Sequence, residues 1–458
     1  MAKKFIKKPE TWGGPECSFN RVKDLYMDQL HYCGHYSRAI EDIECIATLG
    51  IKTMRYPVIW ERLHPQPGHT PGHTIDWSAT VEGPLNALRK HGITPIAGLM
   101  HHGSGPAYAD LLHPSFVSGL THFAGQVARK FPWIEYYAPV NEPLTTARFS
   151  GLYGLWFPHR RSDRAFVQAL LNELKGVVLS MREIRKINPR AKLVQTEDLA
   201  KIYSTPHLSY QATFENHRRW LTYDFLCGMV KPDHPLWNYF ISEGATESSL
   251  YFFMDNPCPP DIIGVDYYAT SERYLDEALE KYPSEKHGSN HREKYADVEA
   301  FRIRHNNPWG IKLLLKECWE RYKIPIAVTE VHINCDSDNQ IRWFSEIRDA
   351  CSALNDQGLD IKAITAWSLF GSFGWNNLLT KADGDYESGV FDISSGKPEA
   401  TPMANYLTRL SEDPDYVHPA QNEKGWWHQE DRFIFDRYPE EELVGEENRF
   451  LNENCFNR

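Results

Sequence analysis

Two glutamates, Glu142 and Glu330, stand where apolar, β-rich runs of the sequence end. Glu142 follows the run WIEYYAPV within Asn141-Glu142-Pro143, and Glu330 closes the run IPIAVTE. Parallel strands buried on both faces have nearly continuous apolar sequences, and α/β barrels carry their catalytic residues at the carboxyl ends of such strands. Glycoside hydrolysis commonly uses two carboxylates that flank the scissile bond. The pair therefore indicates glycosidase chemistry, although either glutamate alone would equally suit a solvated strand end.

The elements that must position this pair follow a regular alternation. Helix-like patterns cover 37–50, 79–92 and 119–131, and Gly50 and Gly92 close the first two as C-terminal caps. Strand–helix alternation indicates a parallel sheet, and eight repeats predict an α/β fold of the (β/α)8 TIM-barrel type. An open doubly wound sheet is the alternative, but no glycine-rich phosphate loop follows a strand. The expected strands are 11–17, 51–58, 94–101, 133–141, 192–197, 261–267, 325–330 and 361–367.

Composition excludes several classes of partner. The 458-residue chain has a formal net charge of −11, which argues against nucleic acid and anionic membranes as partners. Its nine cysteines are scattered without metal-ligand spacing, so we expect free thiols, no metal or cofactor, and a cytoplasmic location. No secretory signal and no run of transmembrane length is found. A carbohydrate is the expected partner, and association into homo-oligomers stays open.

The domain organisation is expected to be simple. Residues 1–410 form the barrel, and 411–458, rich in acidic and aromatic residues, form a tail packed on it. The polar, interrupted segment 270–305 is expected to be a long loop after the sixth strand, over the barrel mouth.

Polar and aromatic residues gather at the expected strand ends, where we expect most of them to face one cavity. A metal-dependent barrel hydrolase is disfavoured, because the first strand carries no histidine pair and neighbouring residues on a strand point to opposite faces. The strand-end residues are Arg55, His101, His102, Asn141, Glu142, Glu197, Asp198, Asp266, Tyr267, Glu330 and Trp367.

Seven sequence blocks resemble glycoside hydrolase family 1, a family of retaining (β/α)8 glycosidases, over about residues 11–410. They are WGGPECSFN, LGIKTMRYPVIWERLHP, GITPIAGLMHHG, YAPVNEP, DIIGVDYY, IPIAVTE and AITAWSLFGSFGW. The arrangement also resembles the glycosidase-like portion of bacterial proteins fused to a sugar-nucleotide reductase of the dehydrorhamnose type. That second likeness implies a carbohydrate-processing context and identifies no substrate.

The resemblance implies a role for each catalytic residue. Glu142 is expected to be the general acid/base, with a pKa raised by apolar surroundings and by the second carboxylate. Glu330 is expected to be the ionised nucleophile, with Arg55 beside it and Tyr267 donating a hydrogen bond to it. Asn141 is expected to contact the sugar 2-OH. Arg55 as a structural ion-pair partner and Tyr267 as a core residue are the alternatives.

The aromatic side of the site also follows from the resemblance. His101 is expected to contact a sugar hydroxyl, and Trp367 to offer its ring face to the sugar. A satisfied strand-end histidine and plain barrel packing are the alternatives for these two residues. The resemblance gives no role to Glu197 and Asp198.

Several positions depart from the family pattern. Asn20 replaces a glutamine, His102 a tryptophan, Asp266 an asparagine, and Gly374, next to the expected subsite residue Trp375, a glutamate. Two anchors for the outer hydroxyls of a glucose-like ring are therefore missing or shortened. The polar set that could serve another glycone is Glu16, Asn20, His102, Arg148 and Asp266.

We therefore expect a retaining, exo-acting β-glycosidase whose glycone is not plain glucose. A non-hydrolytic carbohydrate-binding or regulatory protein on a relict barrel and a transglycosidase are the alternatives.

Overall fold

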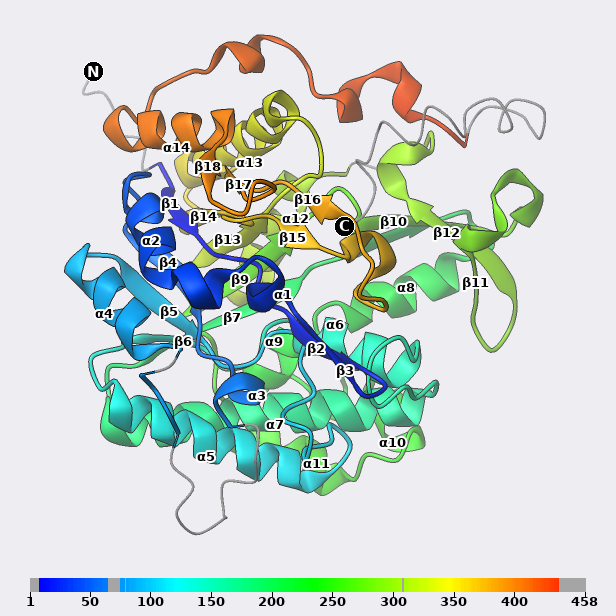
Figure 1. The fold of residues 1–458 in the computed structure, drawn as a ribbon. Helices are drawn as coiled ribbons and strands as arrows, with labels where there is room; N and C mark the ends of the chain where they lie inside the picture. Colours follow the sequence, from blue (N-terminus) through cyan, green and yellow to red (C-terminus); the bar gives the residue numbers. More distant parts are fainter. Residues whose placement is uncertain (1–7, 65–74, 79, 307–308, 436–458) are drawn as a thin grey trace.

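Eight parallel strands close into a barrel at the centre of the molecule (Figure 1). The structure is a computed structural model that describes residues 8–64, 75–78, 80–306 and 309–435. The strands follow one another in the order β1-β14-β13-β9-β7-β6-β5-β4. The predicted (β/α)8 barrel and all eight expected strand positions are confirmed. The barrel strands are β1 (Glu10–Gly13), β4 (Thr53–Pro57), β5 (Thr94–Gly98), β6 (Tyr136–Ala138), β7 (Lys192–Asp198), β9 (Ile262–Tyr267), β13 (Ile326–Val331) and β14 (Ile361–Ala366).

Apolar side chains fill the interior of the barrel and the space outside it. An inner cluster takes one residue from each of seven strands, from Trp12 of β1 to Ala363 of β14. Because side chains alternate along a strand, the residues between these face the surrounding helices and join a much larger core. The barrel is thus a packed support that leaves only its carboxyl end for chemistry.

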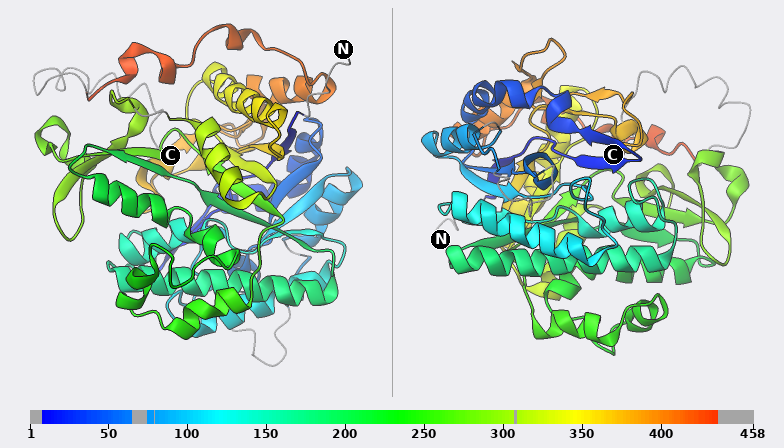
Figure 2. Two further views of the ribbon diagram at one scale, coloured as in Figure 1. Left: turned by 180° about the vertical axis from the view of Figure 1, so that it is seen from behind. Right: turned by 60° about the horizontal axis from the view of Figure 1, so that its bottom comes forward.

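Helices surround the barrel, with α5 and α7 packed along each other on one side and α13 and α14 on another (Figures 1 and 2). The helices are α1 (Gln29–Tyr32), α2 (His35–Ala47), α3 (Trp60–Leu63), α4 (Glu82–Lys90), α5 (Pro114–Lys130), α6 (Pro143–Ala147), α7 (Asp163–Ile187), α8 (Ser209–Arg218), α9 (Leu221–Leu226), α10 (Trp237–Ser242), α11 (Glu247–Asp255), α12 (Ile311–Tyr322), α13 (Ser337–Asp356) and α14 (Pro402–Glu412). Three short hairpins pair β2 (Phe19–Val22) with β3 (Leu25–Asp28), β15 (Ser372–Phe373) with β16 (Tyr386–Glu387), and β17 (Phe391–Asp392) with β18 (Glu399–Ala400).

The prediction of a long loop at 270–305 is wrong, because this segment forms most of a second sheet. Strands β10 (Glu272–Asp276), β11 (His287–Ser289) and β12 (Lys294–Glu299) join β8 (Lys201–Ser204) in the order β11-β12-β10-β8. This sheet projects to one side of the barrel in both views of Figure 2. Its charged side chains pair with one another, as Arg273 does with Asp297 at 2.7 Å and with Glu299 at 3.2 Å. Charges that suggested a solvated loop are therefore cross-strand partners.

The chain after α14 lies along α13. Trp427 is buried, its ring meets that of Trp343 edge-on at 5.0 Å, and its Nε1 donates to Glu346 at 2.8 Å. The remainder of the expected tail, 436–458, lies outside the described residues.

The expectation that every cysteine is a free thiol is wrong at one position. Among the cysteines of the described residues, seven are free, whereas Cys335 is disulfide-bonded. The cysteine pattern therefore gives weaker support to a reducing compartment. Among the described residues, no helix has both the length and the apolarity needed to cross a bilayer.

Candidate active site

Three buried carboxylates meet at the carboxyl end of the barrel. Glu142 follows β6, and Asp266 and Glu330 are the last residues but one of β9 and β13. One carboxylate oxygen from each lies within 4.8 Å of the others. The two glutamates that the sequence analysis paired thus lie together, and Asp266 makes the pair a group of three.

Glu330 is held by two hydrogen-bond donors. Arg55 Nη1 donates to Oε1 at 2.8 Å, and the hydroxyl of Tyr268 donates to Oε2. The pairing of β13 with β9 shifts register between Val328 and Glu330, an irregularity that re-aims side chains near a strand end. Donors on both oxygens, one of them a cation, favour the ionised carboxylate that a nucleophile requires.

Glu142 has a different environment. Its backbone is left-handed, with φ at 44°, and its N–H donates to the carbonyl of Thr196 at 3.2 Å. Burial raises the pKa of Glu142 well above its ordinary value, and the charges of Asp266 and then Glu330 raise it further. A carboxyl that stays protonated at neutral pH can donate a proton to a leaving group.

Arg55 connects the nucleophile to the wall of the site. Besides Glu330, it donates to the Thr329 carbonyl at 3.0 Å and, through Nη2, to Asn141 Oδ1 at 2.6 Å. Its guanidinium lies 4.6 Å from the ring centre of Trp367. Burial alone would lower the pKa of Arg55, but Glu330 and Asp266 hold it above the ordinary value, so the side chain is a permanent cation.

The expected hydrogen bond from Tyr267 to Glu330 is wrong. The Tyr267 hydroxyl donates to Glu272 at 3.0 Å, and its ring stacks on Trp343 of α13 at 5.6 Å. Alternation along the strand explains this, since Tyr267 faces the helices whereas Asp266 and Tyr268 face the barrel axis. The same alternation, applied to Asp266-Tyr267-Tyr268, would have selected Tyr268 from the sequence.

His101 and Trp367 form an aromatic wall beside Glu330. Their rings stack at 5.6 Å with an interplanar angle of 10°, and His101 Nε2 lies 4.0 Å from Glu330 Oε1. Asn141 Nδ2 lies 3.1 Å from the same ring nitrogen. The Trp367 Nε1 donates to Glu16 at 3.1 Å. Glu16 therefore holds the tryptophan of this wall in place.

The outer end of the site differs in character. His102 Nε2 lies 3.6 Å from a Glu142 oxygen, and its ring packs against Trp156 and Trp375 at 5.1 and 5.6 Å. Asn20 is fully buried and donates to the Leu379 carbonyl at 3.1 Å. Gly374 has φ at +77°, where a side chain would be strained. This end is therefore aromatic and lacks the acid that the family pattern places there.

Arg148, the last member of the polar set, lies away from the three carboxylates. Its Nη2 donates to Thr145 Oγ1 at 3.1 Å, in the segment that follows Glu142. It also lowers the pKa of Asp198, which burial raises to about 6. Of the five residues in that set, Asp266 and His102 are the two that lie against the carboxylate pair.

Glu197, to which the sequence assigned no role, anchors the segment behind Glu142. Its carboxylate accepts from the Leu144 and Thr145 amides at 2.8 and 3.3 Å, and from the hydroxyls of Thr145 and Thr222 at 3.1 and 2.7 Å. It thereby fixes the start of α6. An acidic residue on the helix-facing side of a strand was the only signal available in the sequence.

The spacing of Glu142, Asp266 and Glu330 would also suit a cation. Both oxygens of Glu330 already accept hydrogen bonds, however, from Arg55 and Tyr268. Calcium and magnesium take six or more oxygen ligands. The arrangement fits acid/base and nucleophilic chemistry better than it fits a metal centre.

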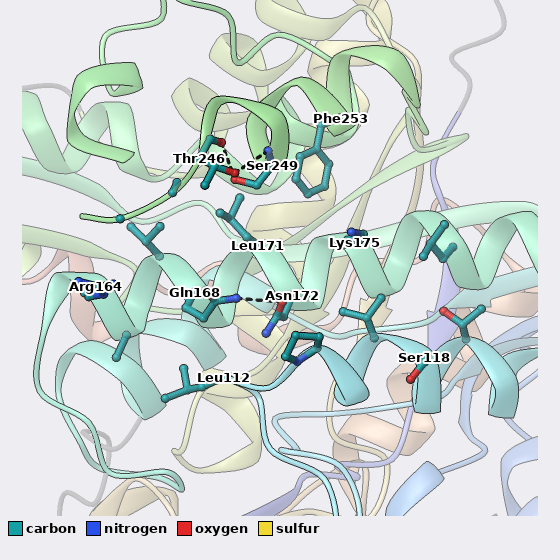
Figure 3. Close-up of a pocket in the computed structure, with 18 of the residues that line it drawn as sticks. Leu112, Ser118, Arg164, Gln168, Leu171, Asn172, Lys175, Thr246, Ser249 and Phe253 are labelled. Atoms are coloured by element: carbon teal, nitrogen blue, oxygen red, sulfur yellow. Dashed lines mark hydrogen bonds between the residues drawn. The ribbon is translucent and has the colours of Figure 1, made fainter. Parts of the chain in front are cut away.

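A cavity of about 1030 Å³ lies elsewhere, between α5, α7 and α11 (Figure 3). Leu171, Lys175 and Phe253 are among its lining residues, and no strand-end residue lines it. It is therefore separate from the candidate active site.

Comparisons with known proteins give a family match and a shared fold. The model of glycosyl hydrolase family 1 matches residues 19–384. A coniferin β-glucosidase of Pinus contorta is 22% identical over 425 residues, which cover 81% of this chain and 80% of that protein. An aryl-phospho-β-D-glucosidase of Bacillus subtilis (strain 168) is 20% identical over 388 residues, covering 76% and 80%. A solved β-glucosidase from Thermotoga maritima in complex with deoxynojirimycin shares the fold, with a TM-score of 0.71, 17% identity, and coverage of 91% of this chain and 100% of that one.

Proposed function

Because the chain belongs to glycosyl hydrolase family 1 and is a glycosidase, we propose that it removes terminal β-linked sugars from saccharides or glycosides with retention of configuration. One observation carries the proposal. Carboxylate oxygens of Glu142 and Glu330 lie within 4.8 Å of each other. Burial and the neighbouring carboxylates raise the pKa of Glu142, and Arg55 donates a hydrogen bond to Glu330. Retaining pairs lie about 5–5.5 Å apart, whereas inverting pairs lie about 6.5–9.5 Å apart to admit a water.

In the first step, a Glu330 oxygen attacks the anomeric carbon and forms a glycosyl ester. The bond to the leaving oxygen breaks, and that oxygen takes the proton of Glu142. In the second step, the Glu142 carboxylate takes a proton from water as the water oxygen attacks the anomeric carbon. The ester bond breaks, Glu330 regains its charge, and Glu142 its proton. Tyr268 and Arg55 hold Glu330 in position through both steps.

The burial of the two carboxylates supports action on the ends of saccharides. Glu142 and Glu330 are 5% and 2% exposed, and the aromatic side chains of His102, Trp156 and Trp375 crowd the outer end of the site. A buried pair of carboxylates suits a terminal sugar better than the interior of a polysaccharide.

The glycone is proposed to differ from plain glucose. Asn20 donates to the chain itself, and Gly374 offers no side chain where the family pattern has a glutamate. The named activities of the relatives, on coniferin and on aryl-phospho-glucosides, concern different substrates, so family membership alone does not fix the sugar.

Product stereochemistry tests the mechanism. Aryl β-glycosides with a range of glycones are incubated with the protein, and the first-formed anomer is followed by proton NMR. The β anomer appearing first supports retention, and the α anomer appearing first overturns it. Sugar binding without turnover of any glycoside would favour the non-hydrolytic alternative.

A further inference from the structure

Asp266 is the member of the carboxylate group that no step of the proposed reaction uses. We propose that it binds a positively charged substituent on C2 of the glycone, so that the preferred substrate is a β-glycoside of a 2-amino-2-deoxy sugar. The inference rests on the proposed glycosidase function and names the substrate class of that same site.

The position of Asp266 selects the C2 end of the sugar. One of its oxygens lies within 4.8 Å of oxygens from both Glu142 and Glu330. In a retaining site these two residues flank the anomeric carbon. A third group close to both therefore lies beside the anomeric carbon and its ring neighbours. Of the two ring atoms bonded to the anomeric carbon, only C2 carries a substituent that differs between sugars.

Asp266 has two protein donors close to it. The side chain has no exposed surface, and Oδ1 accepts from Thr329 at 2.7 Å. Burial raises the pKa of Asp266, and a hydrogen bond with the side chain of Glu142 lowers it. Once Glu142 gives its proton to the leaving group, Asp266 loses that donor, and a buried carboxylate without enough donors carries a desolvation cost. A donor on the substrate would remove that cost.

The charge balance favours a cationic donor over a neutral one. Arg55 lies 2.8 Å from Glu330 and 3.7 Å from Asp266, so one guanidinium faces two carboxylates. With Glu142 protonated, the group retains one negative charge without a matching cation. A substrate ammonium would balance this charge, whereas a hydroxyl would only fill the hydrogen bond.

The same arrangement suits the chemistry of amino sugars. Positive charge develops at the anomeric carbon in the transition state, and an ammonium on the adjacent carbon opposes it. A carboxylate within reach of both positions offsets that repulsion in a buried site, where charges interact more strongly than in water. A divalent cation fits less well, because Arg55 and Tyr268 already occupy the oxygens of Glu330.

Binding of free sugars tests the proposal without requiring turnover. Dissociation constants are measured by calorimetry at about pH 7, where amines of this kind are largely protonated. The probes are two matched pairs, glucosamine with glucose and galactosamine with galactose. In at least one pair the amino sugar is expected to bind about tenfold or more tighter. The 2-acetamido counterpart, which is neutral, should lose this advantage.

Two variants locate the effect. Asp266→Asn keeps the size of the side chain and should abolish the preference, so that the amino sugar and its neutral partner bind about equally. Asp198→Asn removes a carboxylate outside the group of three and should retain the preference. Melting temperature and binding of the neutral sugar by Asp266→Asn show whether the variant is folded. Repeating the titrations with EDTA shows whether a metal ion is needed.

Three outcomes overturn the inference: equal binding within both pairs, a preference that survives Asp266→Asn, or a preference that EDTA abolishes. These results are separate from failure of the proposed function. An amino-sugar preference in a protein that forms no glycosyl intermediate would reject the retaining reaction and leave the binding site intact.

Discussion

The Tyr268 hydroxyl donates a hydrogen bond to Glu330, while the neighbouring Tyr267 turns away and donates to Glu272. The two tyrosines thus form a natural pair of test and control. Tyr268 fixes the carboxylate that is proposed to attack the sugar. Tyr267 packs between the barrel and α13 against Trp343.

Tyr268→Phe is expected to lower kcat/KM by about tenfold or more, because hydrogen bonds to charged groups contribute about 1.5–3 kcal/mol. Tyr267→Phe should leave kcat/KM within about twofold and lower stability by about 1 kcal/mol, since Glu272 loses a donor. Kinetics with an aryl glycoside and urea denaturation measure the two effects. A larger catalytic loss in the Tyr267 variant would contradict the assignment.

Asp266→Asn is expected to move the alkaline limb of kcat/KM to lower pH. Burial raises the pKa of Glu142 most, and Asp266 is the charge that raises it most. Removing that charge lowers the pKa, so Glu142 loses its catalytic proton at a lower pH. The measurement is a pH profile with a neutral aryl glycoside.

Asp198→Asn is the control for this profile. Asp198 also raises the pKa of Glu142, but less than Asp266, Glu330 or Glu197 does. Its replacement should shift the limb in the same direction by a smaller amount. An alkaline limb that does not move in Asp266→Asn would show that Glu142 is not the group titrating there.

Glu197→Gln is expected to lower both stability and kcat. The carboxylate accepts four hydrogen bonds around the start of α6, two on each oxygen. In glutamine an NH2 group replaces one of these oxygens, so it would face two donors and leave them without an acceptor. Leaving buried donors unsatisfied costs about 1–3 kcal/mol. Thermal unfolding and kcat with an aryl glycoside measure the change.

Glu173→Gln provides a matched buried control. Both carboxylate oxygens of Glu173 lack hydrogen-bond partners among the described residues. Its replacement by a neutral amide of the same shape should cause no comparable loss. Equal effects of the two substitutions would remove the anchoring role of Glu197.

Aryl β-glucoside is expected to be a poor substrate relative to at least one other glycone. Asn20 is engaged with Leu379 and Gly374 has no side chain, so two anchors for outer hydroxyls are weakened or lost. Each charged or bidentate hydrogen bond lost costs about 1.5–3 kcal/mol, or more than tenfold in binding. The comparison is kcat/KM across β-glucoside, β-galactoside, β-fucoside, β-xyloside, β-glucuronide and 2-amino-2-deoxy glycosides. A clear preference for β-glucoside would contradict the inference from these two positions.

Most strands of the barrel could be predicted because they contain an apolar run, as in the segment that ends at Glu330. The segment 270–305 could not, because Arg273 and its carboxylate partners come together only when β10 and β12 pair. The contact of Tyr268 with Glu330 could have been predicted from the alternation of side chains along β9. The anchoring role of Glu197 could not be predicted, because its hydrogen-bond donors lie on α6 and α9, and only the packing of these helices brings them to the carboxylate.

The group of three carboxylates shows the same limit. The sequence marked Asp266 as a departure from the family pattern, but its closeness to both Glu142 and Glu330 depends on the closure of the barrel. Barrel closure is what converts three separate strand ends into one site.

Intact-protein mass spectrometry with 2-fluoro glycosides tests the central claim most directly, because these reagents trap the glycosyl ester. The wild type is expected to gain the mass of one fluorosugar, and Glu330→Gln to gain none, since an amide cannot act as the anionic nucleophile. Glu142→Gln should still be labelled when the leaving group is activated, because such a group needs little protonation. Equal labelling of wild type and Glu330→Gln would contradict the assignment of Glu330 as the nucleophile.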